Sequence, residues 1–223
     1  MIFAAGLGTR MGALTKSRPK PLVNVAGRAL IDYALDIAQG ADLRRIAVNT
    51  HHLSDQLHAH LSDRPVHLSN EADQLLDTGG GLRNALPLLG EGPVFTLNSD
   101  AIWRGPNPLD HLRASWDPDR MDALVLLLPP TQAAAHSGAG DFLLSPDGQL
   151  QRGPGMIYLG AQIIVPDLLR DIPQDVFSLN LVWDKMIARR RLFGVVYPGK
   201  WCDVGGPEGI EKAQKLLAAH PDV

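Results

Sequence analysis

Residues 4–22 read AAGLGTRMGALTKSRPKPL, and this stretch decides how the rest of the chain is interpreted. A short apolar segment runs into a turn with glycines at Gly6 and Gly8, where the absence of a Cβ lets backbone N–H groups approach an anion closely. Arg10 follows the turn, and Lys20 stands between two prolines. Both cations can neutralise the charge of an anion bound by these N–H groups, so the stretch predicts a binding site for a triphosphate.

Two better-known glycine motifs do not fit these residues. The P-loop requires G-x-x-x-x-G-K-[ST], and no such run occurs in the chain. The dinucleotide fingerprint requires G-x-G-x-x-G, but Met11 stands at the third glycine position and Gly12 comes one place late. Pro19 and Pro21 remove backbone donors and disfavour a helix before them, so we expect an irregular loop as far as Pro21. For a bare G-x-G, an ordinary glycine-rich turn is the alternative.

The glycine turn belongs to a longer series of motifs. GLGTRM at residues 6–11, followed by RPKPL at 18–22, resembles the signature of the sugar-1-phosphate nucleotidyltransferases, or NDP-sugar pyrophosphorylases. Within that family the chain is similar to the compact group of N-acetylmuramate-1-phosphate uridylyltransferases and mannose-1-phosphate guanylyltransferase-like proteins. The likeness covers almost the whole chain, continuing in the family's order through DTGGG at 77–81, NSD at 98–100, GDF at 140–142 and WCDVG at 201–205.

Composition narrows the class of partner. The chain has 223 residues, of which 45% are hydrophobic and 20% are charged, as in ordinary globular proteins. Its formal net charge of −3 argues against nucleic acid or an anionic membrane as the main partner. The single cysteine, Cys202, excludes an internal disulfide framework and favours a reducing cytoplasm. The expected partners are therefore a nucleoside triphosphate and a sugar 1-phosphate, and the pattern does not predict an oligomeric state.

The order of apolar and helical segments predicts an α/β fold. Short apolar strands are expected at residues 2–4, 45–49, 66–69, 94–97 and 123–128, with helices at 30–39, 53–61, 80–89 and 108–115. The strands are apolar without strict alternation, as in a parallel sheet covered on both faces. The second half predicts a hairpin around residues 142–150, strands at 156–165 and 192–197, and helices at 180–190 and 207–217.

These expectations combine into one fold. It is a Rossmann-like, mixed but mainly parallel sheet flanked by helices, the fold that the resemblance also implies. We expect a single nucleotidyltransferase domain over residues 1–223. Its nucleotide lobe lies mainly in residues 1–130, and its sugar-binding lobe mainly in 131–205.

Two carboxylates are candidate metal ligands. Asp100 follows the apolar strand at 94–97, and the carboxyl ends of parallel strands are where ligands gather. Asp203 lies among apolar and small residues, where an unpartnered carboxylate is costly. A helix cap for Asp100 and a turn for Asp203 are the alternatives. The resemblance implies that the two together hold Mg²⁺, a cation that prefers oxygen ligands.

The remaining candidates take their roles from the resemblance. It implies that Arg10 and Lys20 are the catalytic cations, with solvated surface charge as the alternative. The implied sugar contacts are Asn98 and Asp141; for Asp141, which follows Gly140, a turn residue is the alternative. Three consecutive glycines would permit a flat approach to a nucleobase, or else form a flexible loop. The predicted nucleotide-binding set is Gly6, Gly8, Thr9, Arg10, Lys20, Thr78, Gly79 and Gly80.

The histidines form a different kind of cluster. His51, His52, His58 and His60 lie close in sequence, but His58 and His60 are two apart and point to different sides of a helix. No zinc-ligand spacing completes them, so we interpret them as surface histidines. Cys202 and Trp183 are interpreted as packing residues.

The predicted activity follows from these motifs together. A sugar 1-phosphate is already largely dianionic at neutral pH, since its second pKa is about 6, and needs no activated side-chain nucleophile. Positioning and electrostatic stabilisation then carry the reaction. We expect transfer of a nucleotidyl group from a nucleoside triphosphate to a sugar 1-phosphate with release of pyrophosphate. UTP with N-acetylmuramate 1-phosphate is the first choice; the alternatives are GTP with mannose 1-phosphate and a non-catalytic nucleotide- or sugar-sensing module.

Overall fold

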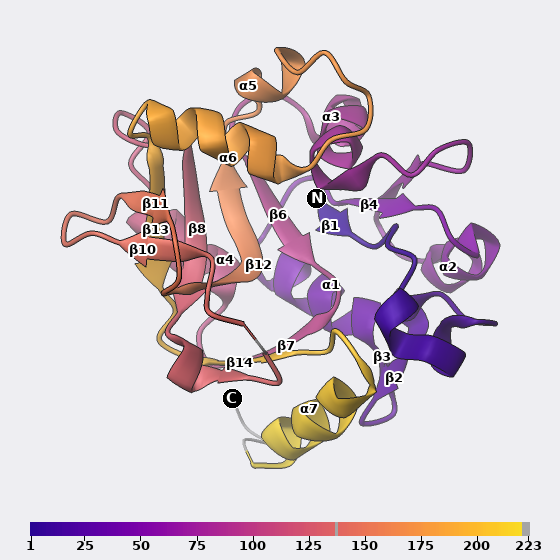
Figure 1. The fold of residues 1–223 in the computed structure, drawn as a ribbon. Coiled ribbons are helices and arrows are strands. Elements are labelled where there is room, and N and C mark those ends of the chain that lie inside the picture. Colours follow the sequence, from indigo (N-terminus) through magenta and orange to yellow (C-terminus); the bar gives the residue numbers. More distant parts are fainter. Residues whose placement is uncertain (137, 220–223) are drawn as a thin grey trace.

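The computed structural model describes residues 1–136 and 138–219 (Figure 1). Within these residues, seven strands form the main sheet in the order β13-β8-β12-β6-β1-β4-β5. Neighbouring pairs are parallel except for those of β12, which runs antiparallel to both β6 and β8. The predicted mixed, mainly parallel sheet is confirmed. Its strands are β1 (Ile2–Phe3), β4 (Ala47–Thr50), β5 (His67–Asn70), β6 (Val94–Asn98), β8 (Ala123–Leu128), β12 (Ile157–Ile164) and β13 (Leu192–Val196).

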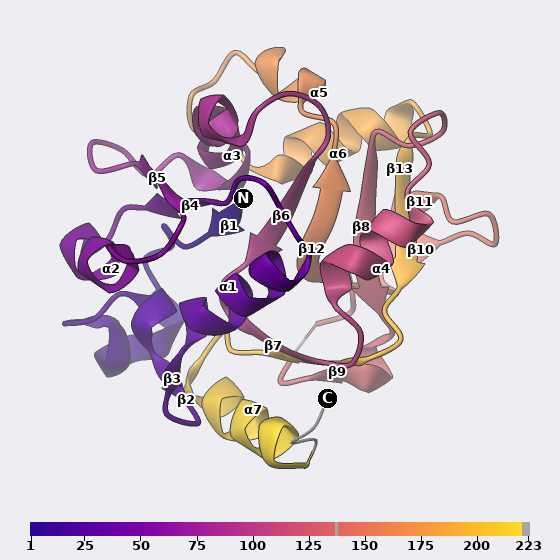
Figure 2. The same cartoon turned by 180° about the vertical axis from the view of Figure 1, so that it is seen from behind.

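Helices cover both faces of this sheet. One face carries α1 (Leu30–Gly40) and α4 (Pro108–Ser115), seen in front in Figure 2; the other carries α3 (Asp77–Leu89) and α6 (Leu179–Ala188). Strand β8 explains why alternation is missing from the sequence: Leu124, Leu126 and Leu128 join the core under α1 and α4, while Val125 and Leu127 join the core under α3 and α6. Every residue of the strand is buried, so every residue is apolar.

A second, smaller sheet was not predicted from the sequence. It consists of β7 (Ala101–Arg104), β14 (Lys200–Asp203) and β9 (Ala133–Ala134), with β14 in the middle. In the antiparallel register of β7 and β14, Asp203 lies opposite Ala101. The backbone N–H of Val204 also donates to the carbonyl of Asp100 over 2.8 Å. This sheet therefore brings together two carboxylates that are a hundred residues apart in sequence.

The remaining elements flank these two sheets. Helix α7 (Pro207–Ala219) packs with the β2–β3 hairpin around a third apolar cluster that includes the fully buried Cys202. The predicted hairpin of β10 and β11 is present. The other described elements are α2 (Ser54–Leu61), α5 (Asp167–Arg170), β2 (Asn24–Val25), β3 (Arg28–Ala29), β10 (Phe142–Leu144) and β11 (Leu150–Arg152).

Two expectations near the predicted site are wrong in detail. The stretch before Pro21 is not an irregular loop throughout, because Thr9–Thr15 forms a 3₁₀ helix that is kinked at Gly12, where φ is 59° and ψ is −122°. Lys20–Leu22 forms a second short 3₁₀ turn. Helix α3 begins at Asp77 rather than at residue 80, so the glycine run lies in its first turn. No helix among the described residues has the length and apolarity to span a membrane.

Candidate active site

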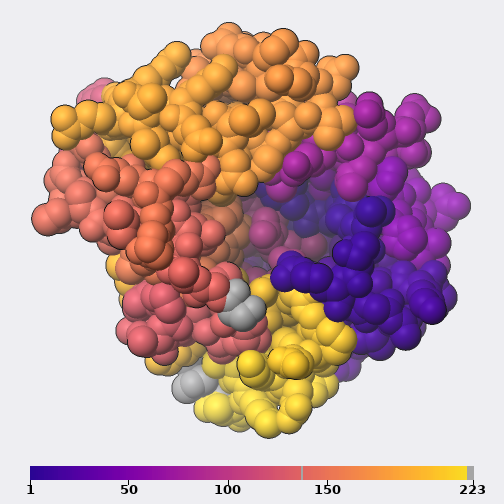
Figure 3. All heavy atoms as spheres, viewed as in Figure 1, coloured from indigo at the N-terminus to yellow at the C-terminus, as the bar shows by residue number. Residues whose placement is uncertain are grey.

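Two adjoining cavities open near the carboxyl ends of β1 and β6. The glycine-loop cavity, of about 440 Å³, is lined by Gly6, Lys20 and Thr78 together with apolar residues of the segments around Leu75 and Val176. The Asp141 cavity, of about 480 Å³, is lined by side chains from β12, β14 and the start of α7. Asn98 and Asp100 line both cavities. Figure 3 shows the hollow between the N-terminal segment, the second half of the chain and α7.

The glycine turn folds back onto Lys20. Gly8 has a φ of 65°, and a Cβ there would lie 2.9 Å from the Cβ of Lys20 and 3.0 Å from the Thr15 side chain. The hydroxyl of Thr15 donates to the carbonyl of Gly8 over 2.9 Å, which closes the turn. Only glycine combines this left-handed conformation with such close contact. At Gly6, by contrast, a Cβ would meet nothing within 4 Å, and that residue faces the cavity.

Lys20 is held at the boundary between the cavities by Asp100. Its Nζ lies 2.6 Å from Asp100 Oδ2, and the two side chains are only 11% and 28% exposed. Lys20 is thus not a solvated surface charge, and Asp100 is neither a helix cap nor a residue in open solvent. A half-buried ion pair of this kind fixes both side chains where two anionic substrates could meet.

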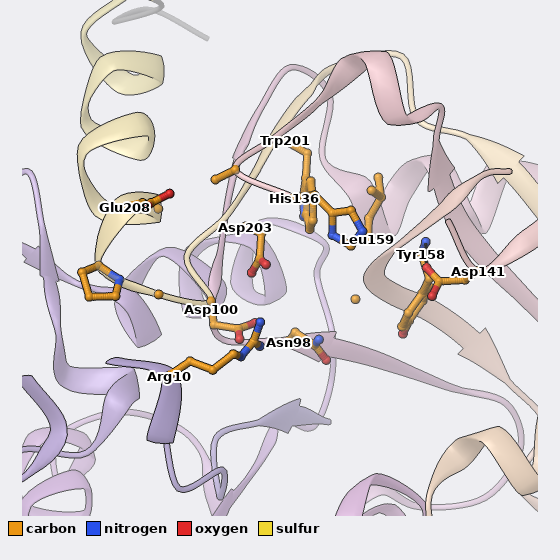
Figure 4. Close-up of a pocket in the computed structure, with 16 residues that line it drawn as sticks. Arg10, Asn98, Asp100, His136, Asp141, Tyr158, Leu159, Trp201, Asp203 and Glu208 are labelled. Carbon is orange, nitrogen blue, oxygen red and sulfur yellow. Dashed lines mark hydrogen bonds between the residues drawn. The ribbon is translucent and has the colours of Figure 1, made fainter. Parts of the chain in front are cut away.

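Asp203 and Arg10 lie near Asp100 on the side of the Asp141 cavity. A Cβ on Gly205 would lie 2.8 Å from Arg10 Nη1 and equally 2.8 Å from Asp203 Oδ2, so Gly205 leaves room for both groups to come together. Burial and the neighbouring Asp100 carboxylate raise the pKa of Asp203, against the opposing effect of Lys20 and Arg10. A positive charge added beside Asp203 would therefore stabilise its ionised carboxylate. Figure 4 shows Arg10, Asp100 and Asp203 projecting toward one another.

Asn98, at the end of β6, and Asp141, just before β10, both line the Asp141 cavity. Asn98 ends β6 beside Gly160, a glycine inside β12 with a φ of 83°, where a Cβ would lie 2.7 Å from Asn98 Nδ2. The ladder of β12 with β8 also shifts register between Tyr158 and Gln162. Asp141 accepts a hydrogen bond from the backbone N–H of Tyr158 over 2.8 Å. The structure thus brings both predicted sugar-contact residues into one cavity.

The glycines of α3 have a packing role that the sequence did not predict. The N–H groups of Gly79 and Gly80 both donate to the carbonyl of Phe177, over 2.9 and 3.0 Å. A Cβ at Gly79 would lie 2.4 Å from the Phe177 ring, and one at Gly81 would lie 2.6 Å from Glu71 Oε1. The run is therefore packed into the first turn of α3 and is not a flexible loop, while its contact with a nucleobase stays a prediction. Thr78 lines the glycine-loop cavity, and Thr9 lies on the exposed side of the 3₁₀ helix.

The clustered histidines have separate partners. His51 bonds to the carbonyl of Glu71, His58 to the hydroxyl of Thr50, and His60 to the carboxylate of Asp32. His52 bonds to the carbonyl of Thr15 over 3.2 Å and so contacts the 3₁₀ helix that carries Arg10. Within the part of the chain that the structure describes, no group of three or more His, Cys, Asp or Glu residues could hold a metal ion.

Some cavity residues escaped the sequence reasoning. His136, Tyr158, Trp201 and Glu208 line the Asp141 cavity, but none of them has a site role predicted from the sequence, because they come from separate segments and Trp201 appears only as a member of the WCDVG motif. One signal was available. A lone glycine in an apolar strand, as in the MIYLGAQII of residues 156–164, commonly marks a bulge or a close approach of another chain segment, and Gly160 lies beside Asn98 for that reason.

Comparison with known proteins decides the family. Residues 1–144 match the model of the MobA-like NTP transferase domain. The chain belongs to this family. It is 41% identical to the N-acetylmuramate alpha-1-phosphate uridylyltransferase of Caulobacter vibrioides over 98% of this chain and 96% of the relative. The enzyme of the same name from Neisseria meningitidis serogroup B is 33% identical over 98% of both chains.

Solved structures of this NTP transferase fold share the architecture at low sequence identity. HddC from Yersinia pseudotuberculosis, crystallised with GMP-PN, superposes with a TM-score of 0.77 at 22% identity over 97% of both chains. A putative glucose-1-phosphate thymidylyltransferase from Bacillus anthracis superposes with a TM-score of 0.79 at 15% identity, over 100% of this chain and 94% of its own. These likenesses show the fold of the nucleotidyltransferases.

Proposed function

We propose that this NTP transferase moves the uridylyl group of UTP to N-acetylmuramate 1-phosphate and releases pyrophosphate. The near-complete match to uridylyltransferases of that substrate supports the choice of base and sugar. The observation that carries the proposal is the shared wall of the two cavities. Asn98 and Asp100 belong to both, so a nucleotide in the glycine-loop cavity and a sugar phosphate in the Asp141 cavity would meet at the Lys20–Asp100 pair.

The chain's own residues supply positioning and charge rather than a nucleophile. The sugar-phosphate oxygen attacks the α-phosphorus of UTP, the bond from that phosphorus to the β-phosphate oxygen breaks, and pyrophosphate leaves. Lys20 would contact the α-phosphate, because its Nζ lies at the shared wall. Arg10 would hold the β- and γ-phosphates and stabilise the leaving pyrophosphate. Electrostatic stabilisation from preorganised groups of this kind is typically the largest contribution in phosphoryl transfer.

Asp100 and Asp203 fit Mg²⁺ as their partner. Asp100 and Asp203 line the same partly buried cavity, where burial first and the nearby Asp100 carboxylate second raise the pKa of Asp203, and hard oxygen ligands of this type suit the ion. Two carboxylates do not complete six ligands, but Mg²⁺ ordinarily keeps waters and takes the rest from substrate phosphates. The ion would neutralise charge on the phosphates when it is bound. We therefore infer that Asp100 and Asp203 would hold Mg²⁺.

The proposal extends to the organisation of the chain and its surroundings. Residues 1–223 would form one catalytic domain, since the Asp141 cavity takes Asn98 and Asp100 from the predicted nucleotide lobe and Asp141 and Asp203 from the predicted sugar-binding lobe. The nucleotides and sugar phosphates that such an enzyme uses are cytoplasmic metabolites, so we assign it to the cytoplasm.

A substrate grid tests the proposal directly. Pyrophosphate release would be measured with Mg²⁺ for each of the four common nucleoside triphosphates against the 1-phosphates of N-acetylmuramate, N-acetylglucosamine, glucose and mannose. The expected result is the highest kcat/KM for UTP with N-acetylmuramate 1-phosphate. Preference for GTP with mannose 1-phosphate would establish the guanylyltransferase alternative. Binding of a nucleotide without release from any pair would leave the sensing module as the function.

A further inference from the structure

We propose that His136 selects sugar 1-phosphates that carry a carboxylate on the sugar, by donating a ring N–H to that carboxylate. The inference rests on the proposed function. N-acetylmuramate differs from N-acetylglucosamine by a lactyl ether on the C3 oxygen, which ends in a carboxylate. Its 1-phosphate therefore brings two anions into the Asp141 cavity, and the second anion needs a partner of its own.

The acidic lining of the cavity makes a positively charged or N–H-donating partner for the second anion necessary. Four acidic side chains line it, namely Asp100, Asp141, Asp203 and Glu208. Among the described lining residues, the side chains that can carry positive charge are Arg10 and His136. Arg10 lies beside Asp203 at the phosphate end. His136 is then the group left for an anion elsewhere in the cavity, because a buried or half-buried carboxylate without a partner is costly.

The other polar side chains of the cavity are less suited to a second carboxylate. Burial raises the pKa of the Tyr158 hydroxyl, which therefore stays neutral and brings no positive charge to the cavity. Asp141 and Glu208 would repel an anion. The Asn98 amide lies against Gly160 at the end of β6. An imidazole offers at least one N–H donor in either protonation state, and two donors with a positive charge when it is protonated.

The surroundings of His136 hold its ring in place. Trp201 lies on one side, with the two ring centroids 6.4 Å apart. On another side Gly138 leaves room for the imidazole, since a Cβ there would lie 2.9 Å from His136 Nε2. Figure 4 shows the His136 ring projecting into the cavity between Asp203 and Asp141. A positive charge on the ring, when it is protonated, would lower the pKa of the Asp203 carboxyl.

A comparison of two sugars isolates the contact with the lactyl group. N-acetylglucosamine 1-phosphate has the same ring, acetamido group and phosphate but lacks the carboxylate. Its inhibition constant against N-acetylmuramate 1-phosphate, divided by the KM for N-acetylmuramate 1-phosphate, measures discrimination for the lactyl group. An indirect effect of His136 on Asp203 would act on both sugars and cancel in this ratio.

The experiment compares H136L, H136K and the control H67L with the wild type. Leucine has no side-chain donor, so discrimination should fall by about 10- to 100-fold in H136L, the range for losing one hydrogen bond to a charged group. H136K keeps a positive donor and should stay within a few-fold of the wild type. H67L replaces an exposed histidine on β5 that does not line the cavity, and it should leave the ratio unchanged.

The outcomes separate the two proposals. Turnover of N-acetylmuramate 1-phosphate with unchanged discrimination in H136L would overturn the assignment of His136 and leave the proposed function in place. An equal fall in H136L and H136K would show that the shape of the ring rather than a donated N–H matters, which would also overturn it. A wild-type protein that turns over another sugar 1-phosphate but not N-acetylmuramate 1-phosphate would overturn the proposed function itself, and the assignment with it.

Discussion

Replacing Asp100 with asparagine should separate catalysis from stability. The substitution keeps the shape of the side chain and removes the charge that pairs with Lys20 over 2.6 Å. It also removes the negative neighbour that raises the pKa of Asp203. The first effect leaves a cation with an 11% exposed side chain without its partner, and the second relieves a repulsion, so the two effects on folding oppose each other.

The size of the stability effect follows from the burial of the pair. Exposed ion pairs contribute about 0.2–1 kcal/mol, whereas removing one partner of a fully buried pair costs about 3–5 kcal/mol. At exposures of 11% and 28%, and with the relief of Asp203, we expect a net loss of about 1 kcal/mol. In a chain of this size that loss lowers the Tm by about 2–4 °C. Turnover should fall by about 10² to 10³, because the charge arrangement at the shared wall is lost.

A double-mutant cycle measures how much the Lys20–Asp100 pair contributes to stability and to turnover. D100N, K20M and the double variant would each be unfolded in urea, and pyrophosphate release would be followed with saturating Mg²⁺ and UTP. We expect a coupling free energy of about 1 kcal/mol in unfolding, and similarly low turnover in all three variants because the residues act as a unit. Turnover of D100N within threefold of the wild type would refute the placement of Asp100 at the reacting phosphates. A coupling near zero would refute the contribution of the ion pair to folding.

Three further substitutions test other parts of the site. D203N should abolish turnover yet raise the Tm of the metal-free protein near neutral pH. Because the folded-state pKa of Asp203 is raised, the wild-type protein loses stability as the pH rises through that pKa, and the gain in D203N should disappear in acid. A Tm gain that persists in acid would contradict burial and repulsion of the Asp203 charge as its cause. G79A should destabilise by about 1–3 kcal/mol in urea unfolding because its Cβ would meet the Phe177 ring, whereas a neutral G79A would mean that this loop is free to move. H52A should lower turnover no more than about fivefold, the equivalent of one hydrogen bond to Thr15, and a loss beyond a hundredfold would give His52 a chemical role.

The sequence predicted the main sheet well because burial on both faces leaves a strong local pattern. The bounds of β8 and α4 agree with the expected residues, and α1 differs by one residue at its end. Local patterns failed where glycine and proline dominate. The expected helix begins only at residue 80, with a flexible loop as the alternative for the glycine run at 79–81, but contacts with Phe177, Asp175 and Glu71 hold the whole run in the first turn of α3. Strands β7 and β14 were not predicted; they pair with each other across about a hundred residues, and no local pattern records such a pairing.

The sequence by itself predicts the chemistry available to this protein. Its motifs contain a glycine turn that can approach an anion, two cations beside it and two carboxylates, but no activated nucleophile. Those properties reside in single residues and their near neighbours, so the chain's order suffices to predict them. Which of these groups meet depends on the folded structure. Lys20 reaches Asp100 across eighty positions, Asp203 joins them through the β7–β14 ladder, and His136 enters the same cavity. Contacts between distant segments depend on how the layers pack, and no local pattern records that packing.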